Sequence, residues 1–217
     1  MLTFPVIHFS EPEPTCTFIV GQILSGTASS YSYTADIGPA DDPNRLVVVC
    51  VKGARDSGGS ISGTIGGVAF TQVAGQNLSN GAEYIVSAVV PTGTTATIVI
   101  NWSQAQVSTR LCIYVLRFLT STTVYANATT TTASSNATTI SSISPPVKSI
   151  VIGHTGSQNA VSWTWGGLVE DYDSGALTNY NFSSASKYFP AGATTPTITA
   201  TASGSWTNAI MSVVCWR

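Results

Sequence analysis

Four aromatic residues in the second half of the chain have the residue types of a sugar-binding surface. Trp163 and Trp165 are two positions apart in the segment SWTW, so on a strand they project from the same face. Tyr172 and Tyr180 follow in a polar segment that contains Asn, Asp and Ser. A glycan is recognised by apolar ring contact together with directional hydrogen bonds, and these side chains provide both. The alternative, open for all four, is that the rings belong to the hydrophobic core.

Two acidic clusters have ligand types that suit a hard cation. Glu170, Asp171 and Asp173 lie in LVEDYDSG, and Asp41 and Asp42 lie in PADDPN. Carboxylate and carbonyl oxygens in loops are the ligands that Ca²⁺ prefers. Neither segment matches an EF-hand loop, and solvated turn residues are the alternative. We therefore expect no bound metal.

Few residues are suited to acid–base or nucleophilic catalysis. The chain has 2 histidines: His8 near the N-terminus, and His154 after an apolar run, where we expect a structural role at the end of a sheet. No serine lies in a GxSxG segment, and no glycine-rich phosphate loop precedes a helical pattern. The sequence predicts a protein that is not an enzyme and has no cofactor. A hydrolase on this scaffold would need acidic residues that converge in a cleft.

Ionised side chains are scarce. Asp, Glu, Lys and Arg make up 8% of the chain, against roughly 25% in an ordinary soluble domain. The net charge of −2 gives no basic field, so nucleic acid is not an expected partner. Ser and Thr make up roughly a quarter of the residues, well above ordinary usage. Such a surface suits a component of an assembled particle, with contacts made of short hydrogen bonds and apolar patches.

The N-terminal sequence MLTFPVIHFSEPEPTC lacks the basic segment of a signal peptide. No apolar run reaches the ~18 residues of a membrane helix, so we expect no membrane insertion. Cys50, Cys112 and Cys215 each lie within an apolar run, which predicts buried thiols. A disulfide between two of these strands is the alternative.

Short apolar runs rich in Val, Ile, Thr and Tyr recur along the chain, separated by Gly, Asn and Pro turns. They predict strands within residues 45–53, 62–74, 82–90, 95–103, 109–119, 124–130, 147–157, 160–170, 195–203 and 208–217. The segment RLVVVCV is apolar on both faces and should lie in the centre of a sheet, and Gly66-Gly67 should form a hairpin turn. About ten short strands of this kind indicate an all-β fold, an antiparallel β-sandwich of jelly-roll type over residues 31–217.

Residues 1–30 have a different composition, with Pro5, Pro12 and Pro14 followed by a Gly/Ser/Thr stretch. Proline lacks a backbone donor and is confined to edges of sheets, so we expect an extended N-terminal arm. Its apolar segment, Phe4, Pro5, Val6, Ile7 and Phe9, would anchor the protein or add an edge strand to another subunit. A frayed terminus is the alternative.

The order of the segments resembles that of β-sandwich accessory proteins of tailed-phage virions and phage-like particles. The resembling segments are RLVVVCV, IGGVAFTQV, VPTGTTATIVINWS, LCIYVL, VKSIVIGHTGS, SWTW and TPTITATASGSWTNAIMSVVCW, within residues 29–217. The resemblance implies a protein of the virion: head decoration, head spike or fibre, or a tail component. Its partners would be other capsid or tail proteins and copies of itself. The alternative function is that of a carbohydrate-binding adhesin for host-surface polysaccharide, and no site residue carries over.

Overall fold

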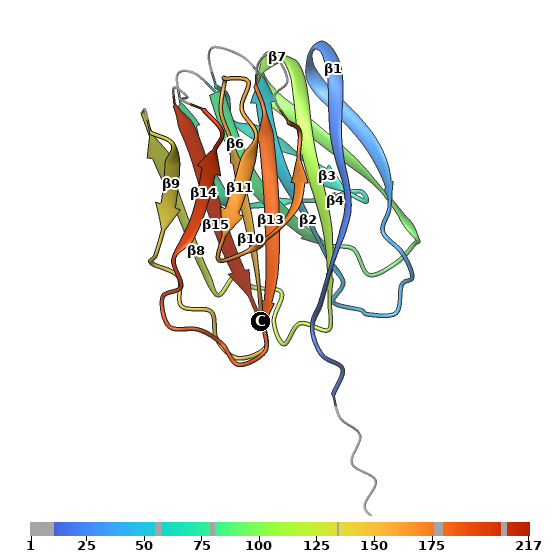
Figure 1. The fold of residues 1–217 in the computed structure, drawn as a ribbon. Helices are drawn as coiled ribbons and strands as arrows, with labels where there is room; N and C mark the ends of the chain where they lie inside the picture. The colour runs from blue at the N-terminus through green and yellow to red at the C-terminus, as the bar shows by residue number, and fades with distance from the viewer. Residues whose placement is uncertain (1–10, 55–57, 79–80, 134, 176–179, 205–207) are drawn as a thin grey trace, which may run out of the picture.

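The computed structural model describes residues 11–54, 58–78, 81–133, 135–175, 180–204 and 208–217, and the regular structure among them is β-strand (Figure 1). The strands are β1 (Thr15–Asp36), β2 (Leu46–Ala54), β3 (Ile61–Ile65), β4 (Val68–Ala69), β5 (Thr71–Leu78), β6 (Gly81–Val89), β7 (Thr95–Arg117), β8 (Ala126–Thr132), β9 (Ala137–Ile140), β10 (Ser149–Gly156), β11 (Trp163–Gly166), β12 (Val169–Asp173), β13 (Phe182–Phe189), β14 (Ile198–Ala202) and β15 (Ala209–Trp216). The described residues include no helix that is long and apolar enough to cross a membrane. The predicted all-β antiparallel sandwich is confirmed.

β1 to β7 form the first sandwich from one strongly curved sheet. Its strands pair in the order β4-β3-β7-β2-β6-β5, and β1 pairs with β7. The first half of β7 pairs with β3 and the second half with β2, so β7 passes from one layer to the other. β1 follows it, with register shifts between Ser25 and Ser30, where Gly26 has a φ of 107°. Side chains from both halves of β7 therefore meet in one core: Ile98, Ile100 and Trp102 with Leu111, Ile113 and Val115.

β8 to β15 form the second sandwich. A five-stranded sheet, in the order β12-β13-β10-β15-β8, faces a three-stranded sheet, in the order β11-β14-β9. Met211, Val213 and Cys215 of β15 meet Ile198 and Ala200 of β14 in the core between the two sheets. Each sandwich therefore consists of two layers of strands with an apolar core of its own.

The two sandwiches share one strand order. β13-β10-β15-β8 repeats the order of β6, β2, the second half of β7 and the first half of β1. β11-β14-β9 likewise repeats β3, the first half of β7 and the second half of β1, and β12 takes the place of β5. We conclude that the fold is an internal duplication, in which the long β1 and β7 of the first sandwich are each divided into two strands in the second.

Local irregularities repeat as well. A register shift leaves Val73 unpaired in β5 and Asp171 unpaired at the corresponding place in β12. Gly93 and Gly192 lie at matching positions after β6 and β13, with φ of 75° and 71°. Positive φ at a turn strongly favours glycine, so the same backbone requirement is met twice.

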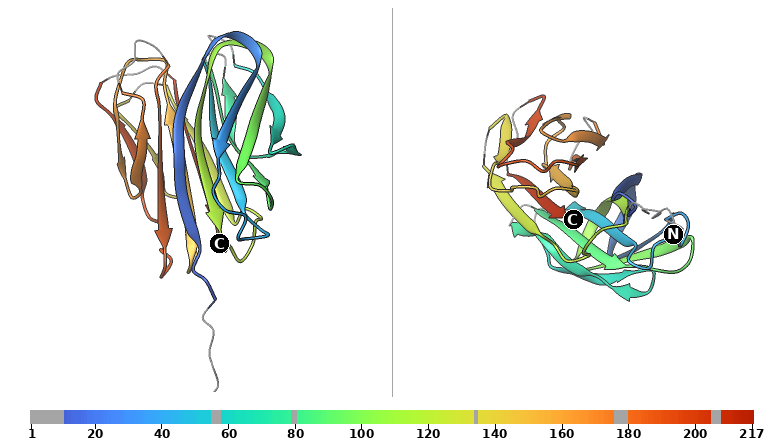
Figure 2. Two further views of the ribbon diagram at one scale, coloured as in Figure 1. Left: turned by 90° about the vertical axis from the view of Figure 1, so that its right-hand side faces the viewer. Right: turned by 90° about the horizontal axis from the view of Figure 1, so that it is seen from below.

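The five-stranded sheet of the second sandwich packs face to face on the layer of the first that contains β6, β2 and β7 (Figure 2). This contact explains why β2 is buried on both faces, as RLVVVCV predicted. Alternate side chains of β2 enter the two clusters: Val47, Val49 and Val51 the core of the first sandwich, and Leu46, Val48 and Cys50 the contact between sandwiches. The contact also includes Val214 and Trp216, whereas Met211, Val213 and Cys215 of the same strand face the other way.

Most predicted strands are present, but several differ in number or bounds. The strand predicted within 62–74 is divided into β3, β4 and the start of β5, the one within 160–170 into β11 and the start of β12, and β9 was not predicted. Residues 95–103 and 109–119 are not separate strands but parts of β7, because residues 104–108 continue the extended backbone through the bend. β13 was not predicted, since FSSASKYF has few β-branched residues; its pairing on β10 compensates. The Gly66-Gly67 turn is confirmed, with φ of 60° and 81°.

All four cysteines are free. Cys50 and Cys112 are paired across β2 and β7 and are fully buried, as is Cys215. Burial raises the pKa of each of these thiols, that of Cys215 to about 11. They pack as small apolar side chains, and the disulfide alternative does not form.

The N-terminal segment enters the first sandwich earlier than its composition suggested. Residues 15–30, expected in the arm, belong to β1 and pair along β7 from Thr15 onward. Before β1, the carboxylate of Glu13 forms an ion pair with Lys148 at 2.8 Å and accepts a hydrogen bond from the Tyr188 hydroxyl. The anchoring residues Phe4, Pro5, Val6, Ile7 and Phe9 lie outside the described residues.

Candidate binding site

An aromatic seam joins the edges of the two sandwiches where β1 meets β12; we use this name for Phe18, Tyr172 and Phe182. The Tyr172 ring lies on Gly21 of β1, where a Cβ atom would be 2.3 Å from the ring. Its centroid is 6.3 Å from that of Phe18 and 5.1 Å from that of Phe182. Glycine at position 21 therefore lets the ring of one sandwich pack on the backbone of the other.

Arg110 of β7 contacts the ring of Tyr180 and lies near Tyr172 of the aromatic seam. Its guanidinium carbon is 5.7 Å from the centre of the Tyr180 ring, and Nη1 donates to Ser108 Oγ at 2.8 Å. Burial lowers the pKa of Arg110 to about 10, and the nearby Tyr180 and Tyr172 oppose that shift. Tyr172 and Tyr180 are both half-buried, so each ring keeps part of its surface in solvent. The structure thus brings together two of the four aromatic residues singled out by sequence.

The two tryptophans lie elsewhere. Trp163 is 1% exposed and belongs to the core of the second sandwich. Trp165 donates from Nε1 to Ser183 Oγ at 2.8 Å and covers Gly153, where a Cβ would be 2.7 Å from the ring. Trp163 therefore packs in the core, which was the alternative that the sequence left open. Trp165 is partly buried and packs against the same core.

Two of the three acidic residues of β12, Asp171 and Asp173, make hydrogen bonds inside the protein. Asp171 accepts a hydrogen bond from the Tyr114 hydroxyl at 3.0 Å, and burial raises its pKa. Asp173 accepts from the backbone N–H of Trp163 at 2.8 Å. Glu170 is exposed, and partial desolvation raises its pKa. Among the described residues no group of three or more His, Cys, Asp and Glu side chains has the arrangement of a metal site.

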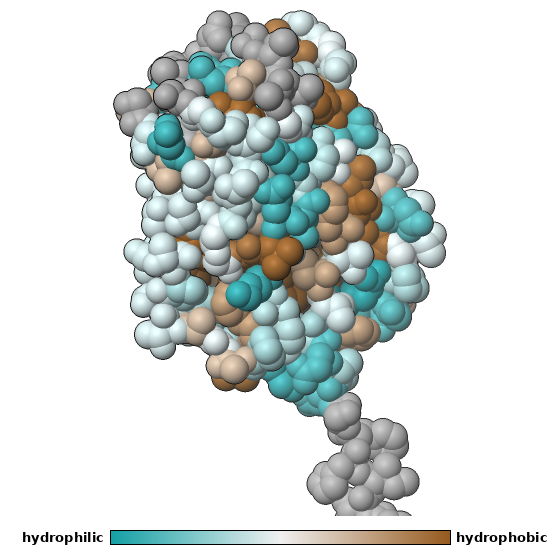
Figure 3. All heavy atoms as spheres, viewed as in Figure 1, coloured by the Kyte–Doolittle hydropathy of each residue, from teal (hydrophilic) through white to brown (hydrophobic). Residues whose placement is uncertain are grey.

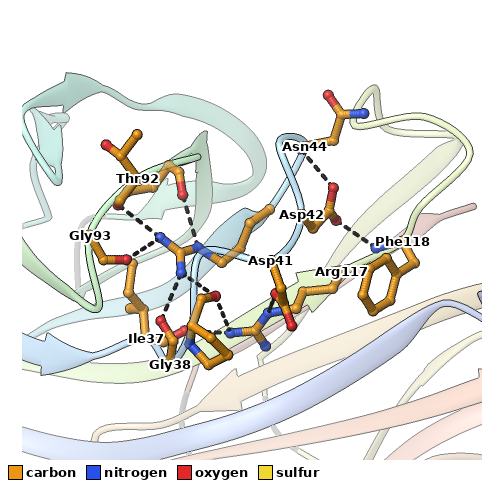
Figure 4. A network of polar contacts seen from close by, with 12 residues as sticks. Ile37, Gly38, Asp41, Asp42, Asn44, Thr92, Gly93, Arg117 and Phe118 are labelled. Atoms are coloured by element: carbon orange, nitrogen blue, oxygen red, sulfur yellow. Dashed lines mark hydrogen bonds and ion pairs between the residues drawn. The ribbon is translucent and has the colours of Figure 1, made fainter.

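The other acidic pair belongs to a polar network at the end of the molecule where β1 begins (Figure 4). Asp41 forms an ion pair with Arg117 at 3.0 Å, and Asp42 accepts from the backbone N–H of Phe118 at 2.6 Å. Phe118 has a φ of 57°, so this bond holds a strained backbone position. Asp42 is buried, and Asp41 is exposed but paired with Arg117, so both carboxylates help to close the loops at this end of the first sandwich.

Arg45 organises the same network. It is fully buried, and its guanidinium donates to five backbone carbonyls at 2.6–2.9 Å: those of Gly38, Pro39, Val90, Thr92 and Gly93. Figure 4 labels three of these acceptor residues, Gly38, Thr92 and Gly93. The planar guanidinium supplies five donors in a rigid arrangement, which is why it satisfies several carbonyls at once. The sequence showed only an arginine before a buried strand and no sign of this role.

A buried ionic cluster lies at the opposite end of the contact between sandwiches. Lys52 Nζ is 2.6 Å from Glu83 Oε1, and His154 Nε2 is 3.7 Å from Glu83 Oε2. Burial raises the pKa of Glu83 to about 7, against the attraction of Lys52. Burial, and then the charge of Lys52, lowers the pKa of His154 to about 3, so the imidazole is neutral. With side chains at most 4% exposed, the three residues are closed to a substrate in this structure.

A groove of about 600 Å³ follows the other edge of the contact, between β4, β5 and β6 of the first sandwich and residues 122–127. Its lining combines aliphatic side chains, such as Val68, Val73, Val89 and Val124, with hydroxyl and amide groups, and it has no charged residue. No motif marked it in the sequence, because its residues come from four separate segments.

Comparisons with known proteins leave the chain without an assigned family. No protein-family model matches it, and no curated protein does. Among solved structures, the PBSX exported protein XepA shows a weak similarity, with 12% identity over 93% of this chain and 86% of that protein. The TM-score of 0.23 is too low for this similarity to support a conclusion about function.

Proposed function

We propose that this protein is a structural subunit of a phage or phage-like particle, joined to the particle at the end where its N-terminal segment leaves the fold. The observation that carries the proposal is the polarity of the molecule (Figure 1). Residues 11–14 and the C-terminus lie at one end, whereas β2, β5, β10 and β12 finish at the other. A chain built this way can be attached at one end and present loops at the other.

The distribution of charge supports this role. Arg45, Arg117, Asp41 and Asp42 form a fixed network at the end where β1 begins, and the pair of Glu13 and Lys148 lies beside the departing segment. The face in Figure 3 is mostly pale, the colour of residues of intermediate hydropathy such as Ser, Thr and Gly. A rigid attachment end and weakly charged sides suit a subunit that packs by shape and short hydrogen bonds.

Deletion of the N-terminal segment tests the proposal. The deletion should remove residues 2–10 and stop there, because a longer one would remove Glu13, which pairs with Lys148 just before β1. Particles assembled with the shortened chain should lack it, as measured by mass spectrometry of purified particles, while the soluble shortened chain keeps its thermal unfolding transition. Undiminished incorporation of the folded, shortened chain would contradict the proposal.

Glycan binding is a second candidate, favoured by the half-exposed rings of Tyr172 and Tyr180 around Arg110. A glycan array or a pull-down with host-envelope polysaccharide tests it, with Tyr180→Ala as the probe. Tyr125→Ala is the matched control, because Arg217 lies over the Tyr125 ring at the same 5.7 Å, far along the sequence from the aromatic seam. Binding that Tyr180→Ala removes and Tyr125→Ala leaves intact would support this function; no binding by the native chain would eliminate it.

A further inference from the structure

Two buried polar atoms that have no hydrogen-bond partner face each other in the contact between the sandwiches. Glu83 Oε2 and His154 Nε2 are 3.7 Å apart, both side chains are fully buried, and neither atom has a hydrogen-bond partner among the described residues. Glu83 belongs to β6 of the first sandwich and His154 to β10 of the second. Buried polar groups in native proteins are nearly always hydrogen-bonded, so this pair needs a physical explanation.

The contacts of the imidazole determine which of its nitrogen atoms carries hydrogen. His154 Nδ1 is 3.1 Å from the backbone carbonyl oxygen of Ser183, on β13 of the same sandwich. A carbonyl oxygen only accepts, so Nδ1 is the protonated nitrogen of the neutral ring and Nε2 has a lone pair. Nε2 therefore faces Glu83 as an acceptor.

The carboxyl group of Glu83 is in a similar position. Its Oε1 accepts a hydrogen bond from Lys52 Nζ at 2.6 Å. If the group were ionised, Oε2 would also be an acceptor, and two lone pairs would face each other away from water. A proton between Oε2 and Nε2 gives both atoms a partner. At 3.7 Å the atoms are too far apart for a hydrogen bond, and a shift of about 1 Å brings them within range.

We propose that Glu83 and His154 hold one proton between them, that Glu83 carries it, and that it links the two sandwiches at this end of their contact. The alternative is an imidazolium that faces a carboxylate beside the ammonium of Lys52. That arrangement buries three charged groups, whereas a proton on Glu83 leaves only the ammonium charged. Because burying charge is costly, the arrangement with fewer charges is favoured.

The neighbouring groups favour the same arrangement. Lys52 lies between Glu83 on β6 and Arg110 on β7 in one row across the sheet, so the row already holds two positive charges. A third positive charge on His154 would be repelled by them. The remaining groups that face the pair from β2, β13 and β15 are the neutral side chains of Cys50, Phe182 and Ser212.

The proton affinities of the two side chains are reversed by the fold. Burial raises the pKa of Glu83 from its usual 4.5 to about 7, against the attraction of Lys52. Burial, and then the charge of Lys52, lowers the pKa of His154 from 6.5 to about 3. In the unfolded chain histidine holds the proton more tightly, and in the folded chain glutamate does. Above pH 7 the folded chain loses this proton, Glu83 pairs with Lys52 as a carboxylate, and the link to His154 is lost.

Nitrogen-15 NMR of the histidine-labelled native chain tests where the proton lies. The chain has 2 histidines, so His8→Gln assigns their signals. At about pH 5.5 we expect Nδ1 of His154 to be protonated and Nε2 to be an acceptor. The signal of Nε2 should then shift with a midpoint near pH 7 as Glu83 ionises. A ring protonated on both nitrogen atoms, a bare Nδ1, or no shift near pH 7 would each overturn the inference.

Glu83→Gln tests the energetic effect of the proton, because glutamine has the shape of a protonated glutamate and does not titrate. Its amide can donate to His154 Nε2 while its oxygen accepts from Lys52. A pKa raised from 4.5 to about 7 contributes stability that is complete below pH 4.5 and is lost as the pH rises through 7. The unfolding constant of the native chain, divided by that of Glu83→Gln, should therefore rise at least about tenfold between pH 5 and 7 and become constant above pH 8. A ratio that is constant or falls over this range would contradict the proton on Glu83.

Glu11→Gln is the matched control, because it removes an exposed carboxylate before β1. The same pH dependence in the ratio for this variant would attribute the effect to the loss of one negative charge and count against the buried pair. If Glu83→Gln does not fold, the NMR measurement on the native chain still decides where the proton lies.

Amide hydrogen exchange tests the link between the sandwiches, with the native chain and Glu83→Gln compared at one pH at a time. At about pH 8.5 the amides of residues 152–156 should exchange faster in the native chain, and at about pH 5.5 the two chains should exchange alike. Equal exchange at both pH values would show that the proton does not hold the sandwiches together.

Discussion

Lys52 and Glu83 form the ionic pair at the cross-strand position of the first sandwich that Gly156 and Phe182 occupy in the second. The pairing register shows the correspondence: Lys52 opposes Glu83 on β6, and Gly156 opposes Phe182 on β13. A Cβ at Gly156 would lie 2.8 Å from Glu83 Oε1 and 2.9 Å from Lys52 Cδ. Glycine at position 156 of the second sandwich thus leaves the space that the Lys52–Glu83 pair of the first sandwich occupies.

Lys52→Met should strongly destabilise the fold, because it leaves Glu83 buried without its partner. Removing one member of a buried ion pair costs about 3–5 kcal/mol, whereas replacing both can be nearly neutral. The double variant Lys52→Met, Glu83→Met should therefore recover much of the loss. Urea unfolding of the two variants and the native chain measures this; a double variant less stable than Lys52→Met would contradict the account.

His154 should make the protein acid-sensitive. Its pKa is about 3 in the fold, below the usual 6.5, chiefly because it is buried. A folded pKa below the unfolded one contributes stability that is complete above pH 6.5 and is lost as the pH falls towards 3. The unfolding free energy of the native chain minus that of His154→Gln should fall by about 1.4 kcal/mol per pH unit in this window. A difference that stays constant between pH 7 and 4 would refute the assignment.

Arg45→Lys should lower stability although it keeps the charge. A lysine ammonium has three donors and no planar fork, so carbonyls that the guanidinium satisfies lose their partner. Each buried group left unsatisfied costs about 1–3 kcal/mol. Arg217→Lys, at the exposed C-terminal residue, is the control and should be close to neutral. Thermal unfolding that is the same for the two variants would show that the network in Figure 4 does not support the fold.

Attachment to the particle should withstand high salt. With 8% charged residues, we expect the proposed contacts of this chain to rest on apolar burial and neutral hydrogen bonds, which salt does not screen. Washing particles in molar NaCl should leave the protein in the pellet. Its release by salt alone would indicate ionic attachment.

Sequence patterns predicted the strands and the fold class because alternation and turn chemistry are local properties. The segment RLVVVCV predicted a strand that is buried on both faces, and β2 does lie between two apolar clusters. The duplication was not recognised, because it is expressed in strand order and in the shifts at Val73 and Asp171 more than in residue identity. Pairing partners far apart in sequence become visible only in the fold.

The candidate site was only partly predictable for the same reason. The two tryptophans of SWTW lie on one strand, but the sequence does not show which face of that strand is covered by the rest of the second sandwich. In the structure Trp163 belongs to its core. Tyr172 and Tyr180 meet around Arg110, a residue of the first sandwich that no local pattern connects with them. The groove between β4, β5, β6 and residues 122–127 likewise combines segments from both sandwiches.

A reconstruction of the particle, with this chain located in it, is the most direct measurement of the proposed role. The account predicts that the end bearing Arg45 and residues 11–14 faces the particle, with the ends of β2 and β10 directed outward. Density for the chain in the reverse orientation, or no such density in particles from cells that make the protein, would contradict it.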